Sequence, residues 1–405
     1  MSPHRMSPHR RRPWRLAAAV ISLFVVVAAA SGCGGKTSGA DPGRVRIGFL
    51  ASLSGTYQAV GTDMRDGFQL YLDTHGNRFG GRAVDLVVAD EGDGGPTAVP
   101  AATKLIKSDR VVALAGLVGG GSVAGVVPLL TENKIPLVGA NGRPELKDPT
   151  WVWTTSFMSV EPGAAIAQYV KEHVDGPVFA IGPDYQGGWD ELKGFTDAYV
   201  KAGGKLANPD GKTVFTPFPQ TSNFLPYFTQ VRNSGAKAVY CFYAGRAAVD
   251  FVKQYRQSDI KDLPLYGAFL TEGSVLDAQG PAADGIFNVL NYSPDLDNAA
   301  NRTFVAAWKA RHDRSPTTFA MASFDAAAVL DKAIAGINGP LTPQAVNDAI
   351  GRLGPIDSPR GGWQFNHTTH APVQKWYLRQ VRTDGRALAN VVVQDLATLG
   401  NSTDK

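Results

Sequence analysis

Cysteine is almost absent from this chain of 405 residues, which contains only Cys33 and Cys241. Two cysteines exclude a small scaffold held by several disulfides, so a chain of this length depends on its hydrophobic core. Charged residues are also sparse at 19%, but a hydrophobic fraction of 44% excludes a disordered protein. The length corresponds to about two or three domains.

Most of the chain has almost no net charge. The formal net charge is +4, yet the first 32 residues contain five arginines and no acid, so the remainder carries −1. These arginines are Arg5, Arg10, Arg11, Arg12 and Arg15. A nearly neutral body offers no basic surface to a polyanion, so no nucleic-acid partner is expected.

The N-terminal apolar run is too short to span a membrane. It covers residues 16–30, fewer than the roughly 20 that a bilayer requires. Arginines precede it and small residues follow it, which is typical of an export signal. Ala30-Ser31-Gly32-Cys33 resembles a bacterial lipobox, and an ordinary signal with an incidental cysteine is the alternative. We expect a signal peptide at 1–32, lipidated Cys33, a flexible tether at 33–43, and anchoring to the extracytoplasmic face of the membrane.

Short β-branched segments alternate with amphipathic segments from residue 45 onward. Met64, Phe68, Tyr71 and Leu72, for example, share one helical face. This alternation predicts an α/β protein with parallel sheets flanked by helices, and two blocks of similar size predict two lobes. Strands are expected at 45–50, 83–89, 111–118, 135–139, 178–181, 213–215, 238–243, 265–268 and 286–290, helices at 61–75, 96–108, 122–133, 223–234, 298–312, 318–338 and 342–352, and a hairpin from 361–365 and 375–381.

A series of short motifs runs from residue 47 to residue 381, within a region of resemblance that covers about residues 44–395. They are Ile47-Gly48-Phe49, Leu53-Ser54-Gly55, Lys104-Leu105-Ile106, Pro128-Leu129-Leu130, Ile135-Pro136-Leu137, Pro144-Glu145-Leu146, Asp184-Tyr185 with Gly188, and Trp376-Tyr377-Leu378 with Arg379-Gln380-Val381. In order and spacing they resemble the leucine-binding (branched-chain amino-acid) substrate-binding proteins of ABC importers.

The resemblance implies a type 1 periplasmic binding protein fold, with two Rossmann-like lobes joined by a three-crossover hinge. Lobe one would comprise 44–157 and 291–366, and lobe two 158–290 and 367–400. Such a protein is a monomer that closes on a small solute and delivers it to ABC permease subunits. A ligand-sensing receptor of the same fold is the alternative.

A triple-glycine bend is the first candidate for the binding site, because ligands of open α/β sheets bind beyond the carboxyl ends of the strands. Gly119-Gly120-Gly121-Ser122 follows the expected strand 111–118. Glycine permits close approach, Ser122 can cap the next helix, and free peptide nitrogens attract an anion. A plain glycine turn is the alternative. The resemblance implies that Gly120, Gly121 and Ser122 hold the carboxylate of the ligand.

The same bend fits the loose dinucleotide fingerprint Gly119-x-Gly121-x-x-Ala124. That fingerprint belongs on the first strand of its unit, whereas this is the third, and no acid ends the following strand. A secreted enzyme is also disfavoured, because no nucleophile–base or metal-ligand set has an interpretable spacing. No cofactor, metal ion or catalytic residue is therefore expected.

The remaining site residues come from the resemblance. Ala140 matches a position where the backbone binds the ligand, and the usual hydroxyl position falls on Gly142, so a side-chain contact there depends on Asn141. Tyr185 with Gln186, and Tyr243, match the loops of lobe two that close over the ligand. Tyrosines packed at the lobe edge are the alternative.

Ligand specificity is where the sequence departs from branched-chain binders. The resemblance implies that Phe269 stands where branched-chain binders have the acid that neutralises the ligand ammonium. A buried ammonium without a charge partner is costly, so either Glu272 or Asp184 substitutes or the ligand has no ammonium. A carboxylate with an aromatic or apolar body, or a neutral amide, fits these residues better.

Overall fold

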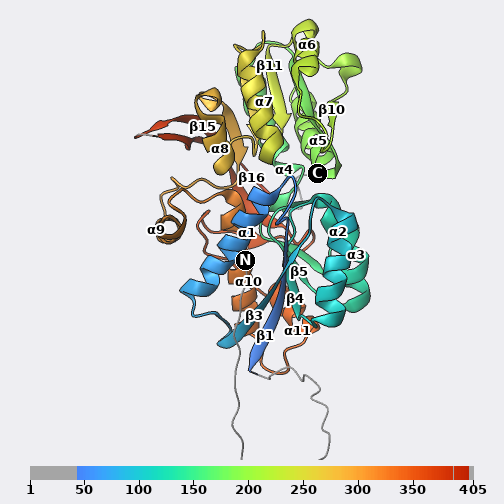
Figure 1. Cartoon of the computed structure of the whole chain (residues 1–405), viewed down its shortest axis with the longest axis vertical. Coiled ribbons are helices and arrows are strands. Elements are labelled where there is room, and N and C mark those ends of the chain that lie inside the picture. Colours follow the sequence, from blue (N-terminus) through green and yellow to red (C-terminus); the bar gives the residue numbers. More distant parts are fainter. Residues whose placement is uncertain (1–42, 386, 401–405) are drawn as a thin grey trace, which may run out of the picture. The chain divides into compact units, whose positions relative to one another are not determined.

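The computed structural model describes residues 43–385 and 387–400. The expected signal peptide, Cys33 and all but the last residue of the tether lie outside this part of the chain. The described residues form two main sheets with helices on their faces (Figure 1). Within them, no helix is long and apolar enough to cross a membrane. Cys241 is buried and makes no disulfide there.

The first sheet has the strand order β2-β3-β1-β4-β5-β7, and its strands are parallel except for β2. Side chains alternate between its faces, so Phe49 packs toward α1 and α10, and Leu50 toward α2 and α3. Its elements are β1 Arg44–Ala51, α1 Gln58–Thr74, β2 Arg78–Phe79, β3 Arg82–Asp90, α2 Gly95–Thr103, β4 Ala113–Gly116, α3 Gly120–Asn133, β5 Leu137–Gly139 and β7 Val152–Thr154.

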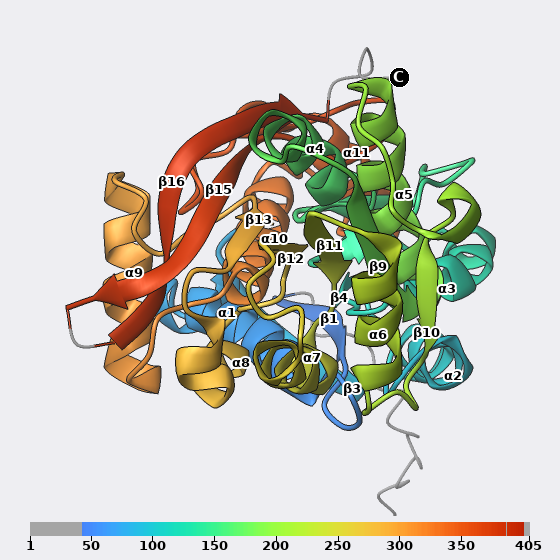
Figure 2. The ribbon, with the colours of Figure 1, turned by 90° about the horizontal axis from the view of Figure 1, so that it is seen from above.

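The second sheet has the order β10-β9-β11-β12-β13-β15-β14, and β16 pairs with β15. Strands β9 to β13 are parallel, so the expected parallel α/β architecture is confirmed in both sheets. One face packs with α4 and α5, and the other with α6, α7 and α8 (Figure 2). The elements are α4 Glu161–His173, β9 Val178–Asp184, α5 Gln186–Lys201, β10 Val214–Pro217, α6 Leu225–Ser234, β11 Ala238–Phe242, α7 Gly245–Gln257, β12 Leu265–Ala268, α8 Ser274–Gln279 and β13 Phe287–Leu290.

After β13 the chain returns to the first sheet through three helices, α9 Ala299–His312, α10 Thr318–Ala335 and α11 Pro343–Gly351. Helix α10 lies against α1, β4 and β5. The chain then enters the second sheet again with β14 Gln364–Phe365, β15 Pro372–Asp384 and β16 Ala387–Leu399. It therefore passes between the sheets three times. A two-stranded sheet of β6 Gly142–Arg143 and β8 Phe157–Met158 joins the segments beyond β5 and β7.

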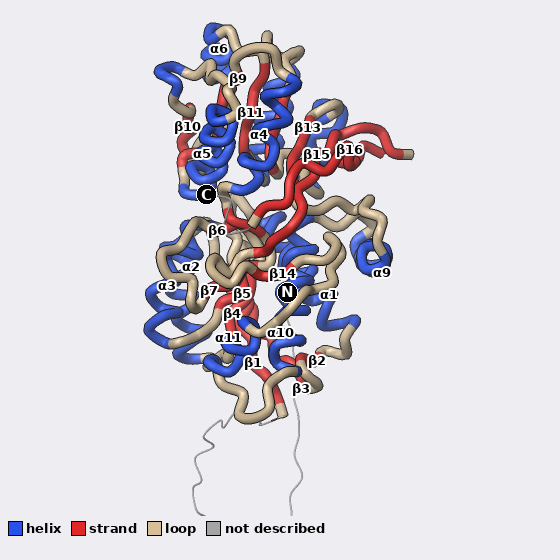
Figure 3. Tube along the Cα trace, turned by 180° about the vertical axis from the view of Figure 1, so that it is seen from behind, coloured by secondary structure: helices blue, strands red, loops and turns tan. Residues whose placement is uncertain are grey.

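Two boundary predictions need correction. Strands β14 and β15 pair as expected for the hairpin, but the long partner of β15 is β16, which was not predicted (Figure 3). Gly385, with φ of 64°, lies in the connection between them. Helix α3 begins at Gly120, two residues before the expected start, because the glycines continue into its first turn.

Candidate functional site

A cavity of about 50 Å³ lies at the carboxyl ends of β4, β5, β9, β11 and β12, which belong to both sheets. One water molecule requires at least about 10–15 Å³ of such space, so this cavity suits a small solute. Its lining residues are Tyr57, Val60, Val118, Gly120, Asn141, Gly142, Phe157, Ser159, Tyr185, Gly187, Glu191, Phe242, Ala244, Phe269 and Phe319. Ligands of open α/β sheets bind at this edge.

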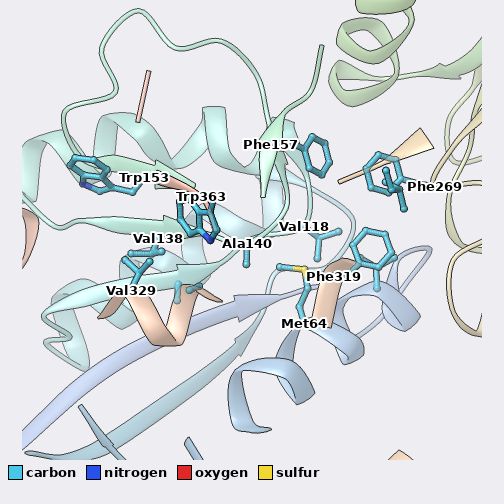
Figure 4. Close-up of a cluster of buried hydrophobic side chains, with 14 of the residues drawn as sticks. Met64, Val118, Val138, Ala140, Trp153, Phe157, Phe269, Phe319, Val329 and Trp363 are labelled. Atoms are coloured by element: carbon cyan, nitrogen blue, oxygen red, sulfur yellow. The ribbon is translucent and has the colours of Figure 1, made fainter. Parts of the chain in front are cut away.

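Aromatic rings form much of the wall. Phe269 stacks between Phe157 and Phe319, with ring centroids 5.0 Å and 5.7 Å away, and meets Phe242 edge-on at 5.9 Å. Figure 4 shows Phe157, Phe269 and Phe319 together near Val118. Phe269 has a φ of 60°, which is rare for a bulky residue. Backbone strain of this kind is characteristic of functional sites, and here it holds the ring in the wall.

Two tyrosines bridge the cavity between the segments of the two sheets. The Tyr57 hydroxyl donates to the Tyr185 hydroxyl at 2.9 Å. Phe218 lies against both rings, with centroids 5.7 Å from Tyr57 and 4.6 Å from Tyr185. Burial raises the pKa of both tyrosines, so both hydroxyls stay neutral at physiological pH. Tyr185 lines the cavity, as predicted, and its contact with a ligand stays a prediction.

The triple-glycine bend forms the start of α3. The Val123 N–H donates to the Gly119 carbonyl, so the peptide nitrogens of Gly120, Gly121 and Ser122 precede the first helical hydrogen bond. Gly120 lines the cavity, whereas Gly121 and Ser122 do not. The prediction that Ser122 caps the helix is wrong, because Gly119 occupies the cap position and Ser122 lies buried inside the first turn.

A buried carboxyl that the sequence did not reveal supports this bend. Glu91 Oε2 accepts the Val118 N–H at 2.7 Å, and its Oε1 accepts the Gly119 N–H at 2.9 Å. Burial raises the pKa of Glu91, although these two hydrogen bonds oppose the rise. Glu91 thus uses two of the nitrogens of this loop and leaves those of Gly120 to Ser122 for an anion. The sequence could have indicated Glu91 only by its position directly after a predicted strand.

The second predicted loop contributes two residues to the wall. Asn141 Nδ2 donates to the Val118 carbonyl at 2.8 Å, while its Oδ1 has no partner among the described residues. Gly142 lies so close to Phe157 that a Cβ atom would be 2.5 Å from ring atom Cε2. Ala140 does not line the cavity, and its N–H donates to the Gly116 carbonyl at 3.0 Å.

Two residues predicted from the loops of lobe two lie off the cavity wall. Gln186 Nε2 donates to Asp190 Oδ1 at 2.8 Å. Tyr243 is buried, and its hydroxyl lies 3.1 Å from that of Thr216. Neither residue lines the cavity. Direct contact of either residue with a ligand in the cavity is therefore not supported in this conformation.

Asp184 and Glu272, the two candidates for pairing with a ligand ammonium, both bind other side chains of the protein. Asp184 is exposed and accepts the Trp189 indole N–H at 2.8 Å. Glu272 pairs with the buried Arg379 at 2.5 Å and accepts the Thr318 N–H at 3.2 Å. The carboxyl that lines the cavity is instead Glu191.

Glu191 lies on the buried face of α5, and only one of its two carboxyl oxygens accepts a hydrogen bond from a described residue. Oε1 accepts the Tyr240 hydroxyl, while Oε2 has no hydrogen-bond partner in the described part of the chain. Burial raises the pKa of Glu191 to about 8. The one sequence signal is its spacing from Phe195 and Tyr199, which places an acid on an apolar helical face.

The described residues do not bring together three His, Cys, Asp or Glu side chains that could hold a metal ion. His370, which with His367 forms the short motif His-Thr-Thr-His, stacks on Trp153 with ring centroids 3.7 Å apart. Its Nδ1 lies 2.9 Å from the Pro149 carbonyl oxygen. His370 therefore has a packing role.

Comparison with known proteins agrees with this geometry. The model of the family described as "Periplasmic binding protein" matches residues 44–386. A Leu/Ile/Val-binding protein homolog 6 from Brucella melitensis is 27% identical over 372 residues, which are 88% of this chain and 93% of that protein.

Several solved structures are also similar. An ABC transporter solute-binding protein from R. palustris in complex with benzoate is 30% identical, with a TM-score of 0.80, covering 88% of this chain and 97% of that one. One from Rhodopseudomonas palustris HaA2 in complex with p-hydroxybenzoic acid is 26% identical, with a TM-score of 0.81 over 88% and 97%. The Streptococcus pneumoniae branched-chain amino acid binding protein in complex with isoleucine shares the fold, at 21% identity and a TM-score of 0.74 over 86% and 99%.

Proposed function

Because this chain belongs to the periplasmic binding protein family, we propose that it captures a small carboxylate-bearing solute outside the cytoplasm and delivers it to an ABC permease. The family consists of binding proteins, so the mechanism is capture and release without chemical conversion. The observation that carries this proposal is the aromatic cavity at strand ends of both sheets. Contacts from both sides favour the closed state once the ligand is bound.

We propose an aromatic acid as the ligand class. The stacked rings of Phe157, Phe269 and Phe319 match the faces of a flat apolar body. The peptide nitrogens from Gly120 to Ser122 at the start of α3 match a carboxylate. A similar protein that is 30% identical was solved with benzoate, which has both features. An aliphatic amino acid would instead require a carboxylate for its ammonium, and Asp184 and Glu272 are engaged elsewhere.

The site then divides into two sets of residues. Gly120, Asn141, Gly142, Tyr185 and Phe269 contact the ligand, and Gly121 and Ser122 face its carboxylate only through their peptide nitrogens. Ala140, Gln186 and Tyr243 support the wall from behind. The hinge divides the chain into lobes at 44–157 with 291–366 and at 158–290 with 367–400. Support for this division comes from α10, which packs on the first sheet.

Titration calorimetry with the purified full chain in detergent tests the ligand class. We expect benzoate and 4-hydroxybenzoate to bind with one-to-one stoichiometry, and leucine, isoleucine and benzamide to bind at least about tenfold more weakly, because each lacks either the aromatic body or the carboxylate. Tight binding of leucine without binding of either aromatic acid would overturn the aromatic assignment. No binding of any of the five would contradict a carboxylate-binding site.

A lipid at Cys33 would hold the protein at the extracytoplasmic face of the membrane. The support is the lipobox-like sequence Ala30-Ser31-Gly32-Cys33 and the polar tether after it. In the native host, we expect Cys33→Ser to move the protein from the membrane fraction to the soluble extracytoplasmic fraction, because stable anchoring requires acyl chains. Cys241→Ser is the matched control and should leave the membrane fraction unchanged. Equal fractionation of both variants would argue for an ordinary signal peptide.

A further inference from the structure

Two residues of the cavity wall, Asn141 and Glu191, carry a buried oxygen without a partner among the described residues, and that of Glu191 has no role in the proposed capture of a carboxylate. Glu191 is 2% exposed and lines the cavity from α5, and its Oε2 has no hydrogen-bond partner among the described residues. Buried polar atoms are rarely left unpaired, because an unmade hydrogen bond is costly. An unpaired oxygen on a side chain that lines the cavity therefore points to a partner supplied by the ligand.

We propose that Glu191 sets the ligand class by donating a hydrogen bond from Oε2 to an uncharged oxygen, such as a hydroxyl, on the ligand opposite its carboxylate. This inference rests on the proposed function, since it assigns the second polar contact of the same solute. The two contacts come from different parts of the fold: the start of α3 beside the first sheet, and α5 beside the second.

The surroundings of Glu191 favour the protonated carboxyl. On β11, Tyr240 donates to Oε1 and Cys241 lies nearby, and on α4 the Gly163 backbone opposes the rise of the pKa. Asp190 is its neighbour on α5 and repels a negative charge. Burial raises the pKa of Tyr185, Tyr240 and Cys241, so these groups are neutral.

None of the groups that shift the pKa of Glu191 is cationic, and burial raises that pKa to about 8. The carboxyl is therefore mostly protonated at neutral pH. Because Oε1 already accepts the Tyr240 hydroxyl, the proton belongs on Oε2. Oε2 then acts as a donor toward the cavity.

A donor at this point selects among solutes. A hydroxyl oxygen can accept its hydrogen bond, whereas unsubstituted benzoate leaves the donor unpaired. An ammonium group carries only donors and cannot accept a hydrogen bond from protonated Oε2. It could bind there only after Glu191 loses its proton. The site therefore favours a hydroxylated aromatic acid over both benzoate and an amino acid.

Dissociation constants of 4-hydroxybenzoate and benzoate test this, since the two probes differ by one hydroxyl. For the full chain we expect a preference for 4-hydroxybenzoate of about tenfold, as for one neutral hydrogen bond in a buried site. In Glu191→Leu this preference falls to about one. In Glu191→Gln it persists, because the amide O can accept from Tyr240 while the amide NH₂ donates in place of Oε2. Glu172→Gln, an exposed glutamate on α4, is the matched control, and thermal unfolding checks that each variant folds.

The pH dependence gives a second readout. The preference of the parent protein falls between about pH 6.5 and 9 as Glu191 loses its proton, while that of Glu191→Gln falls less. Ionisation of the 4-hydroxybenzoate phenol affects the parent and Glu191→Gln equally. The difference between their pH profiles therefore reports Glu191.

Failure of this inference is distinct from failure of the proposed function. If both acids bind with equal affinity to the parent and to Glu191→Leu, Glu191 is not a donor to the ligand, although the carboxylate-binding function stands. If leucine binds tightly and Glu191→Gln abolishes that binding, Glu191 is an ionised partner of an ammonium. If none of the three solutes binds, the proposed function falls and this inference with it.

Discussion

Individual residues of the cavity depart from ordinary preferences. Phe269 adopts a left-handed backbone, Gly142 leaves space that a ring fills, and Glu191 buries a carboxyl whose pKa no cationic group of the described residues lowers. Each departure is costly for folding on its own. Their convergence on one small space is the pattern expected of a site shaped for a ligand.

Gly142 is the most direct test of the shape of the wall. A methyl group at this position would lie 2.5 Å from Phe157 Cε2, so the Phe157 ring must move. We expect Gly142→Ala to lower the free energy of unfolding by about 1–3 kcal/mol and to weaken aromatic-acid binding by about tenfold or more. Calorimetry and urea unfolding measure both. Gly354→Ala, in a loop with open space around it, is the control. Unchanged affinity in Gly142→Ala would show that Phe157 does not shape the site.

Glu191 also predicts how stability depends on pH. Its pKa rises from an ordinary 4.5 in the unfolded chain to about 8 in the folded one. Between these values the folded state binds more protons than the unfolded state, so the free energy of unfolding decreases as pH rises. Glu191→Gln lacks this loss, and we expect its stability relative to the parent to increase by at most about 1.4 kcal/mol per pH unit across that window. Urea unfolding at a series of pH values measures this, with Glu172→Gln as control. Parallel profiles would mean an unshifted pKa.

At the scale of elements, the three crossings between the sheets are tied together by buried polar groups. The Ser156 carbonyl, in the first crossing, accepts from Asn291 Nδ2 of the second at 3.1 Å and from Gln374 Nε2 of the third at 2.5 Å. Arg360 also donates to Ser156 and to Gln374. Asn291 Nδ2 also donates to Gln374 Oε1 at 2.9 Å, so each of the three segments shares a hydrogen bond with the other two, and we expect the segments to move together.

Arg360 and Asp325 form the charged centre of this network. The guanidinium donates to Asp325 Oδ2 at 2.6 Å and 3.1 Å, and both side chains are almost fully buried. Burial raises the pKa of Asp325, while Arg360 opposes the rise. We expect Arg360→Met to lower the free energy of unfolding by about 3–5 kcal/mol, because it leaves a buried carboxylate unpaired.

A matched exposed pair separates this effect from loss of an arginine in general. Arg232 and Asp259 lie 2.6 Å apart on the surface, with side chains 51% and 75% exposed. Arg232→Met should cost about 0–1 kcal/mol in the same urea unfolding experiment. Adding Asp325→Asn to Arg360→Met should restore part of the lost stability. Equal losses for the two arginine variants would show that the buried pair contributes no more than a surface pair.

The sequence predicts which helices and strands form better than where they begin and end. It also predicts the loop residues of the cavity better than Glu191, Phe157 and Phe319, which complete its wall. Periodicity identified β1, α1 and α10 because their apolar residues follow one face or one buried run. Strand β16 was missed, although Asp384-Gly385 is a hairpin-turn signal, since its exposed residues give little alternation. Gly120 was predicted from its position after a strand, and Asn141, Gly142, Tyr185 and Phe269 from the family resemblance; all five line the cavity. The contributions of Glu191, Phe157 and Phe319 depend on packing between distant segments, which no local pattern encodes.

At the scale of the whole described fold, the cavity is bridged by side chains from both sheets. Tyr57 precedes α1 of the first sheet, and Tyr185 and Phe218 follow strands of the second. The 2.9 Å hydrogen bond between the two hydroxyls, and Phe218 packed against both rings, join segments of the two sheets beside the cavity. We expect these contacts to break when the two sheets separate to release a solute. The tyrosine pair should therefore control the lifetime of the bound state more than the rate of capture.

A double-mutant cycle of Tyr57→Phe and Tyr185→Phe tests this control. Phenylalanine keeps the ring packing and removes one hydroxyl, so each single variant loses one hydrogen bond across the cleft. We expect each to raise the dissociation rate of benzoate about 2- to 10-fold and to change the association rate less, as one neutral hydrogen bond predicts. The double variant should dissociate no faster than the faster single one, because both changes remove the same bond. Stopped-flow fluorescence follows release through Trp189, which is 45% exposed and bonded to Asp184 one residue before Tyr185. Additive effects in the double variant would mean that the two hydroxyls act independently, and the closed state would then depend on ligand contacts and ring stacking alone.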